Sequence, residues 1–403
     1  MRRPVRLLGP AVFLLLSASC NWIQEGRWQV YQDDGTKALE QRRYGEAEKQ
    51  WKKSLAIAER FGAQDPRLGT SLNSLGRLYA AQGRYREAEP LYAKALAVWQ
   101  STWGPEHPAV AKALDNLAAL RYAQGRYAEA EPLYKRSLDI KTKVLGPDHP
   151  ERATTEHNLG TVYRAEGRLT DAEPLYKQAL ALREKALGPG HPDVATSLYD
   201  LGNLYRAEGR PAEAEALYRK ALSIWEKSVG GQHPDLAAGL EALADLHRQQ
   251  GRTAEAESLY ERSLSMRREV LGPRHPDVAR SLNGLALLYK SQGRYAEAEP
   301  LARQALDIWE QAFGPDHPDV ATALNNLALL LFAQGRPADA EPLYRRALAI
   351  QEKVLGGQHP DVARTLDNYA ALLRKQGRDG EARSFEARAR DIRARHAWAQ
   401  PGP

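Results

Sequence analysis

Cysteine is almost absent from this chain. Cys20 is the only cysteine among 403 residues, so no disulfide can form within the chain. The short motifs of several enzyme classes are also missing: the sequence holds no phosphate-cradling glycine loop, Cys-x-x-Cys pair, His-Glu-x-x-His or Gly-x-Ser-x-Gly segment. We therefore expect no catalytic residue, no cofactor and no metal site, and we expect that the chain is not an enzyme.

A large excess of one charge is lacking as well. The formal net charge is +6, and three of the positive charges come from Arg2, Arg3 and Arg6 at the start of the sequence. Without these arginines the balance falls to +3. So mild a charge on a chain of this size does not favour a nucleic acid as the partner.

The apolar run that follows these arginines, from Leu7 to Leu16, is too short to span a membrane comfortably. Small residues then precede Cys20, and this order is typical of a secretory signal. It resembles a bacterial lipoprotein signal, which implies removal of residues 1–19 and a lipidated Cys20 that binds the membrane. An ordinary signal peptide or an uncleaved anchor is the alternative. We expect an exported protein of the bacterial cell envelope, lipid-anchored on the periplasmic or outer face.

Most of the remaining sequence consists of copies of one repeat. Each His-Pro pair lies 42 residues after the previous one, and the pairs begin at His107, His149, His191, His233, His275, His317 and His359. Self-similarity at a fixed period of this size predicts a stacked repeat architecture.

One copy, residues 191–232, predicts two helices. Pro192 suits the first position of a helix, and Gly209 suits a left-handed cap at its end. A second amphipathic helix is predicted from about Ala212 to Val229. We call the first helix of each repeat helix A and the second helix B. Two such helices cannot bury their apolar faces alone, so copies are expected to stack into one continuous core.

The His-Pro histidines could suggest a metal or catalytic site. They recur once per repeat, so stacking would separate successive histidines by roughly 10 Å, too far to share one ion. We interpret them as residues that start helix A.

Small residues recur where helices would approach closely, with Gly or Ala in helix A and Ala in helix B. Together with Leu and Tyr in helix A and an aromatic residue in helix B, this pattern resembles the tetratricopeptide repeat. The phrases LNNLALL, QGRY, AEPLY, ALAI and GPDHPDVA, with the 42-residue period, resemble the kinesin light chain subtype. The resemblance implies an all-α fold, a right-handed α-solenoid (superhelix) of stacked antiparallel helix pairs.

The pattern also predicts where the parts of the chain begin and end. Residues 1–19 are the predicted signal peptide, and residues 20–64 form a divergent N-terminal repeat. Residues 65–396 hold eight repeats of about 42 residues, and residues 397–403 are a tail. The charged last helix suits a terminal cap.

The family resemblance also implies a binding groove, because helix A lines the inner, concave face of such superhelices. At one position of helix A, an asparagine of the family typically bonds the backbone of an extended peptide. This chain has asparagine there in four repeats, and Ala242 and Gly284 in two others. The predicted groove asparagines are Asn116, Asn158, Asn326 and Asn368.

Six residues after this position, four consecutive repeats carry a cation: Arg164, Arg206, Arg248 and Lys290. Aromatic residues flank the line, with Tyr122 before it and Phe332 after it. The line is either a basic rail for a ligand or a set of solvated cations that the C-terminal end of a helix favours.

These observations favour a scaffold for protein–protein interaction. We expect it to bind extended, acidic peptide segments of other proteins on its concave face while tethered at a membrane. The alternative is a structural spacer of the cell envelope without a specific ligand. The sequence leaves the partner and the oligomeric state open.

Overall fold

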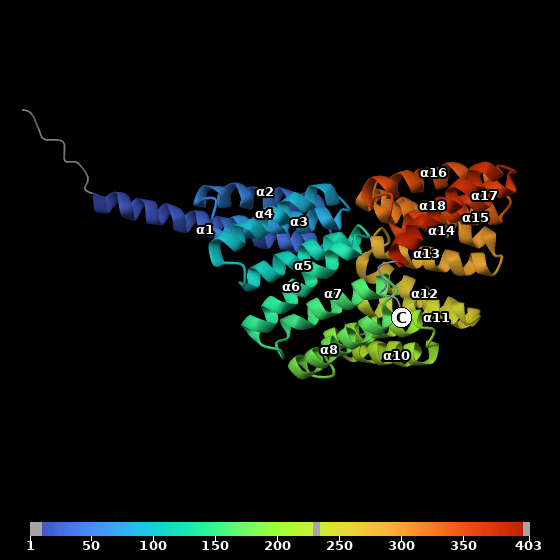
Figure 1. Cartoon of the computed structure of the whole chain (residues 1–403), viewed down its shortest axis with the longest axis horizontal. Helices are drawn as coiled ribbons and strands as arrows, with labels where there is room; N and C mark the ends of the chain where they lie inside the picture. The colour runs from blue at the N-terminus through green and yellow to red at the C-terminus, as the bar shows by residue number, and fades with distance from the viewer. Residues whose placement is uncertain (1–9, 229–233, 398–403) are drawn as a thin grey trace, which may run out of the picture. The chain divides into compact units, whose positions relative to one another are not determined.

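The computed structural model describes residues 10–228 and 234–397, and the side chains of residues 22–228 and 235–395. Within these ranges the regular elements are eighteen α-helices and one short 3-10 helix, and no strand occurs (Figure 1). Adjacent helices pack as stacked pairs. The prediction of an all-α solenoid is therefore confirmed.

The chain divides into two compact units, residues 1–117 and 118–403, and the boundary falls within α5. The helices up to this boundary are α1 (Pro10–Glu40), α2 (Tyr44–Ala58), α3 (Pro66–Ala81), α4 (Tyr85–Trp103) and α5 (Pro108–Ala123), with a 3-10 turn at Glu59–Phe61. Helices α1 and α2 pack as one pair, and α3 and α4 pack as the next.

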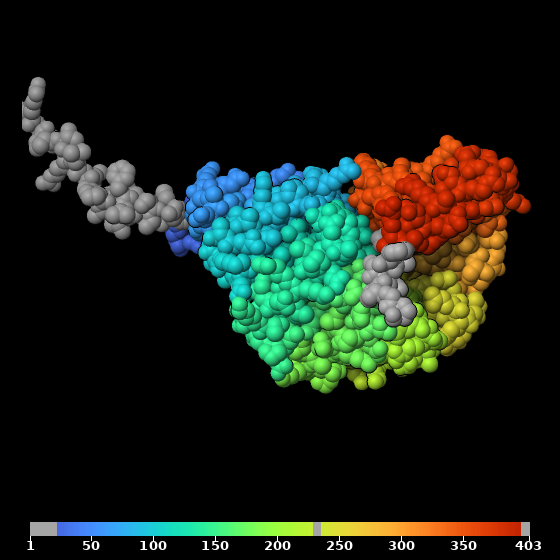
Figure 2. Space-filling model, in the orientation of Figure 1, coloured from blue at the N-terminus to red at the C-terminus, as the bar shows by residue number. Residues whose placement is uncertain are grey.

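The second unit continues the alternation of A and B helices. Its A helices after α5 are α7 (Glu151–Ala165), α9 (Pro192–Ala207), α11 (Pro234–Gln249), α13 (Pro276–Ser291), α15 (Pro318–Ala333) and α17 (Pro360–Lys375). Its B helices are α6 (Tyr127–Leu145), α8 (Leu169–Leu187), α10 (Pro211–Ser228), α12 (Thr253–Leu271), α14 (Tyr295–Phe313), α16 (Pro337–Val354) and α18 (Asp379–Ala397). Figure 2 shows that side chains close the gaps between neighbouring ribbons of this unit.

The His-Pro histidines start the A helices, as predicted. The Nδ1 atom of each accepts a hydrogen bond from the backbone N–H two residues later, at 3.0–3.3 Å, in His107, His149, His191, His275, His317 and His359. His233 lies outside the described residues. Asp65, which replaces the histidine in an earlier repeat, accepts the same bond from Arg67 at 2.9 Å. The bond satisfies a backbone donor that a helix start otherwise leaves unpaired.

A three-residue bridge joins several repeats to the next. Glu257 in α12 accepts a bond from the Tyr289 hydroxyl at 2.9 Å and another from Arg294 Nη1 at 2.8 Å. The Arg294 guanidinium lies 3.9 Å from the centre of the Tyr289 ring and also binds Glu297 at 2.7 Å. The same bridge recurs at Glu131 with Tyr163 and Arg168, and at Glu173 with Tyr205 and Arg210. The sequence analysis did not anticipate this role for the Gly-Arg link.

The small residues of helix A make room for the large residues of helix B. A Cβ atom on Gly202 would lie 2.7 Å from Cε1 of Tyr218, so only glycine fits there without displacing the ring. Tyr218, Leu204 and Ala214 are completely buried beside it. The core of the second unit therefore runs through successive helix pairs rather than through one centre.

The first pair has its own packing. Trp51 of α2 is buried against Gly35 of α1, and Trp51 Nε1 donates to the Gln32 carbonyl at 3.2 Å. Of the predicted signal, residues 1–9 lie outside the described residues, and the Cys20 side chain does too. Among the described helices, none combines the length and the apolar character that a membrane span needs.

The glycine at the end of each helix A predicts a measurable stability difference. Gly209 has φ +73°, a left-handed conformation, whereas Gly190 in the preceding loop does not, and neither has a heavy atom near its missing Cβ. Gly209→Ala should therefore lower the free energy of unfolding by on the order of 1 kcal/mol. Urea unfolding of Gly190→Ala is the matched control, and an equal loss in both variants would contradict the left-handed cap.

Candidate functional site

The predicted basic line lies on consecutive A helices of the second unit. Arg164, Arg206, Arg248 and Lys290 are half-buried residues near the C-terminal ends of α7, α9, α11 and α13. Six residues upstream on the same helices lie Asn158, Asp200, Ala242 and Gly284. We call the half-buried surface that these eight residues line the A-helix face.

The groove asparagines mostly join neighbouring A helices to each other. Asn326 Nδ2 donates to Asn283 Oδ1 at 3.0 Å, and Asn368 Nδ2 donates to Asn325 Oδ1 at 3.1 Å. In the first unit, Asn116 Nδ2 makes the same bond to Asn73 Oδ1 at 2.6 Å. Each amide still has a second N–H, so a ligand could bind without breaking the bond between repeats.

Asn158 differs from the other predicted asparagines. Its side chain is half-buried on α7 and makes no hydrogen bond within the part of the chain that the structure describes. The equivalent contact one repeat later joins His157 Nδ1 and Asp200 Oδ2, which are 3.6 Å apart. In all these contacts the two residues are 43 positions apart. The partner of each groove residue is therefore the residue just before the equivalent position in the previous repeat, which the 42-residue pattern does not reveal.

A cavity of about 220 Å³ opens where the asparagine pattern is broken. Ala242 and Gly284 line it, together with side chains from α9, α11 and α13 that include Arg206, Arg280 and Asn283. Gly284 has a packing reason of its own, because a Cβ atom there would lie 2.6 Å from Cε1 of Tyr260. The two departures from asparagine therefore leave a polar hollow within the A-helix face.

Acids on this face are too few to neutralise its cations. Asp245 lies between two arginines, 3.3 Å from Arg248 Nη2 and 3.8 Å from Arg206 Nη1. Lys290 has no ion pair with any described residue. Burial, and then the nearby charge of Arg248, lowers the pKa of Lys290. Arg206 and Arg248 thus share one carboxylate, Lys290 has none, and the surface keeps a positive excess.

The neighbouring acid, Asp200, is only partly ionised at neutral pH. Burial raises the pKa of Asp200 to about 7, although Arg164 and Arg183 oppose the change. Burial lowers the pKa of His157 to about 4, and Arg183 and Arg164 lower it further, so this imidazole is neutral at pH 7. Asp200 therefore offsets only part of the positive charge of Arg164 and Arg183 at pH 7.

The ends of the line differ from its centre. Tyr122 packs against Tyr127 with ring centres 5.4 Å apart, and Phe332 packs against the core. Arg374, which continues the line beyond Phe332, forms an ion pair with Glu386 at 2.7 Å. The unneutralised part of the line is therefore confined to α7–α13.

Comparison with known proteins identifies the family. The tetratricopeptide repeat pattern matches residues 38–101, 79–143, 109–185, 151–227, 193–269, 235–311, 289–353 and 319–395. The chain belongs to the tetratricopeptide repeat family. This confirms the family resemblance that the sequence analysis identified.

Several solved structures are similar to this tetratricopeptide repeat protein. BtubC (BKLC) from P. vanneervenii is 28% identical, over 59% of this chain and 94% of its own, with a TM-score of 0.47. A Rap protein complexed with competence and sporulation factor has a TM-score of 0.62 over 94% of this chain and all of its own, at 14% identity. The Rap conjugation gene regulator of plasmid pLS20, in complex with the Phr* peptide, has a TM-score of 0.58 over 83% of this chain and 97% of its own, at 14% identity. No curated protein sequence matches the chain.

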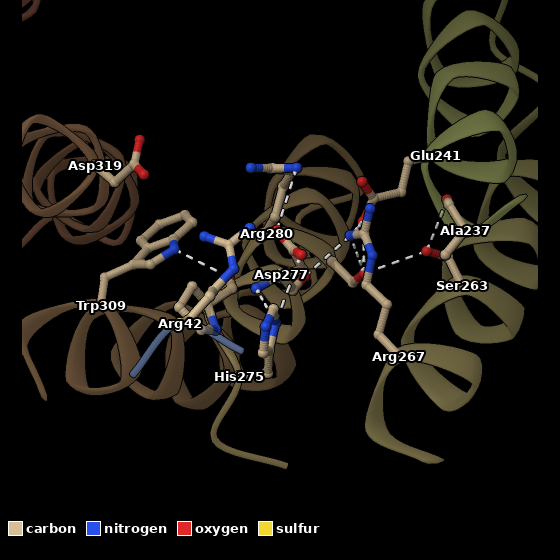
Figure 3. Close-up of polar contacts among 12 residues, drawn as sticks. Arg42, Ala237, Glu241, Ser263, Arg267, His275, Asp277, Arg280, Trp309 and Asp319 are labelled. Atoms are coloured by element: carbon tan, nitrogen blue, oxygen red, sulfur yellow. Dashed lines mark hydrogen bonds and ion pairs between the residues drawn. The ribbon is translucent and has the colours of Figure 1, made fainter. Parts of the chain in front are cut away.

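A buried ion pair supports the tetratricopeptide repeats beneath the cavity, and the sequence analysis missed it. Arg267 in α12 is 2% exposed and binds Glu241 of α11 (Figure 3). Its Nη1 atom also donates to Ser281 Oγ at 2.8 Å and to the Asp277 carbonyl at 3.0 Å. Burial raises the pKa of Glu241. The sequence does hold a signal for the burial of Arg267, because the equivalent position one repeat earlier is the buried Trp225.

In the next repeat a different residue occupies the position of Arg267. One period after Arg267 lies Trp309, whose Nε1 donates to the Pro276 carbonyl at 3.0 Å (Figure 3). Indoles and a guanidinium therefore alternate in one column of the core, at Trp225, Arg267 and Trp309. Among the described residues, no group of three or more His, Cys, Asp or Glu is placed to hold a metal ion.

The raised pKa of Asp200 predicts a pH-dependent stability. Between its ordinary pKa near 3.9 and about 7, the folded chain holds more protons than the unfolded chain, so the carboxylate lowers stability as pH rises. Asp200→Asn should therefore stabilise the fold more at pH 8 than at pH 5, by on the order of 2 kcal/mol. Urea unfolding at the two pH values measures the difference.

His157→Gln is the control of opposite sign. The lowered pKa of His157 means that the unfolded chain gains a proton first as pH falls below about 6.5. That substitution should therefore favour the fold more at pH 5 than at pH 8. If both variants showed the same pH dependence, burial would not be the cause of the shifted pKa values of Asp200 and His157.

Proposed function

We propose that this protein is an interaction scaffold that binds an extended, acidic segment of a partner protein along the A-helix face of α7–α13. The observation that carries the proposal is that Arg206 and Arg248 share one carboxylate, Asp245, while Lys290 forms no ion pair with a described residue. An acidic ligand would supply the missing counter-charges.

Exposed cations on the B helices of the same unit serve as a comparison for the cations of the A-helix face. Several cations of the B helices pair with an acid four residues earlier, as Arg219 does with Glu215 and Arg303 with Glu299, both at 2.7 Å. Lys177 pairs with Glu173 at 2.8 Å in the same way. On the A-helix face, by contrast, Arg206 and Arg248 share one acid and Lys290 forms no ion pair with a described residue, which favours a ligand site over the alternative of a structural spacer.

The polar groups of the face suit an extended chain. A bound peptide must pair its backbone N–H and C=O groups, and the amide of Asn158 has no partner among the described side chains. The cavity beside Ala242 and Gly284 is large enough for one side chain of the ligand, and its wall of Arg206, Arg280, Asn203 and Asn283 with the acids Glu241 and Asp245 suits a polar group. The fold is shared with a Rap protein solved in complex with the Phr* peptide, which supports a peptide as the ligand class.

Charge reversal on the A-helix face tests the proposal. The full chain is applied to an array of random twelve-residue peptides at low salt, and we expect the captured peptides to be rich in Asp and Glu. Arg206→Glu with Arg248→Glu sets repulsion against these peptides and leaves the Leu, Ala and Tyr core intact. Binding of the captured peptides should weaken at least tenfold in this double variant, and it should weaken with salt in the parent.

The matched control carries the same charge change elsewhere. Arg136 and Lys220 are exposed on the B helices α6 and α10 and form no ion pair in the part of the chain described. Arg136→Glu with Lys220→Glu should leave peptide binding within about twofold of the parent. Equal binding by both double variants, or captured peptides without an excess of acids, would leave the A-helix line as solvated charge only.

We further propose that the scaffold is exported and held at a bacterial membrane by acylation of Cys20. The support is the sequence pattern alone: Arg2, Arg3 and Arg6, a short apolar run, small residues and then the only cysteine of the chain. Two or more acyl chains would anchor it stably, whereas one would not.

Mass spectrometry of the protein from a bacterial host tests the anchor. We expect a mature N-terminus at Cys20 with the mass of attached acyl chains, and release of the Cys20→Ser variant from membranes. Ser19→Ala, which keeps both a small residue and the cysteine, is the control and should remain anchored. An unmodified Cys20, or an intact Met1, would rule out the lipid anchor.

A further inference from the structure

The first helix carries an apolar stripe that none of the described side chains of its own unit covers. Trp22, Ile23 and Val30 of α1 are 76%, 53% and 54% exposed. Together with Gly26 and Tyr31 they border one shallow hollow. Residues at this spacing share one side of an α-helix, so the exposed side chains form a continuous surface rather than scattered contacts.

This stripe is not the core side of the helix. The residues of α1 that pack against α2 are Gln32, Gly35 and Ala38, all buried on another side. A terminal repeat of a solenoid normally ends in a polar outer surface. An exposed tryptophan beside exposed Ile23 and Val30 departs from that rule and indicates that something apolar meets this surface.

The stripe is confined to the part of α1 next to Cys20. Trp22 is two residues after Cys20, about 3 Å along the helix, and Val30 is about 15 Å along it. Beyond Val30 the exposed residues of α1 are all charged, Asp33, Asp34, Lys37 and Glu40, and an apolar phase would not accept them. An apolar surface that starts at the proposed anchor and ends after about three turns suits the boundary of a bilayer.

We propose that this stripe lies in the headgroup–acyl boundary of the membrane, beside the acylated Cys20. Tryptophan suits this boundary because its ring is apolar and its N–H can bond to headgroups. Arg27 is exposed next to the stripe, and Lys53 of α2 lies 5.0 Å from the centre of the Tyr31 ring. These two cations can reach lipid phosphates while their stems stay on apolar surface.

The proposal deepens the membrane anchor described above and rests on it. A second copy of the chain is the other partner that could cover an apolar stripe. The membrane is favoured because the stripe is small, adjoins the proposed lipid attachment and has cations at its edge. A dimer contact of three exposed side chains would fall well short of the area that stable association needs.

Quenching by lipid tests the contact directly. The full-length acylated protein is reconstituted into vesicles of phosphatidylcholine and phosphatidylglycerol with brominated acyl chains, which quench tryptophan only on contact. One of the eight tryptophans is Trp22, so about one eighth of the emission should be lost if all emit equally. Trp22→Phe should abolish this loss. Trp103→Phe, which removes a 42% exposed tryptophan of α4, should retain it.

A second pair of variants tests the apolar character of the stripe. Ile23→Glu with Val30→Glu should reduce quenching of Trp22 at least threefold, because two carboxylates would enter the apolar boundary. Val144→Glu with Leu187→Glu makes the same change at exposed aliphatic residues of α6 and α8 and should leave it unchanged.

The outcomes separate this proposal from the anchor itself. Vesicles that carry the protein on flotation without quenching Trp22 would overturn the stripe contact while the anchor stands. Absence of the protein from floated vesicles would overturn both. Unchanged quenching in Ile23→Glu with Val30→Glu, or a change only in the oligomeric state of that variant in detergent, would also overturn the proposal.

Discussion

In several repeats a carboxylate of helix B joins one repeat to the next, and this contact fixes how the end of helix A lies against the preceding helix. Glu257 receives the hydroxyl of Tyr289 and the guanidinium of Arg294, both from the following repeat. Gly293, at φ +74°, reverses the chain between them, so that Arg294 returns over the Tyr289 ring. The end of helix A, Gly293 and Arg294 therefore act together: the left-handed glycine turns the chain so that Arg294 can reach both Tyr289 and Glu257.

This bridge explains why the A-helix face can vary while the fold does not. The stacking contacts use mainly the core stripe and the end of helix A, so the position of Asp200 on its half-buried side accepts different residues in different repeats. Asp200, Ala242 and Gly284 thus occupy one position in successive repeats without disturbing the helices around them. Repeats of nearly identical backbone can in this way carry a cavity in one place and an asparagine contact in another.

The sequence predicted what depends on period and local chemistry. Helix A begins at His191 because the histidine accepts a backbone bond, and it ends at Gly209 because the chain needs a left-handed residue there. Both signals lie within a few residues of the element that they control. The all-helical architecture followed from their repetition.

What the sequence could not predict depends on distance and burial. The 43-residue contact between Asn283 and Asn326 is invisible in a period of 42, because it joins two different positions of the repeat. Arg374 looked equivalent to Arg248, yet Glu386 of the last helix neutralises it. The charge of Asp200 follows from burial between helices, which no local pattern reports.

The two proposed contact surfaces should respond to solution conditions in opposite ways, because they rest on different physics. As proposed, the A-helix face would attract acids through half-buried charges around Asp245, so added salt should weaken that binding and partial protonation of Asp200 below pH 7 should strengthen it. The α1 stripe excludes water from Trp22, Ile23 and Val30, and a salt such as sulfate strengthens burial of that kind. A change of ionic strength can therefore release the ligand while the anchor end stays on the membrane, and this separates the two activities without altering a residue.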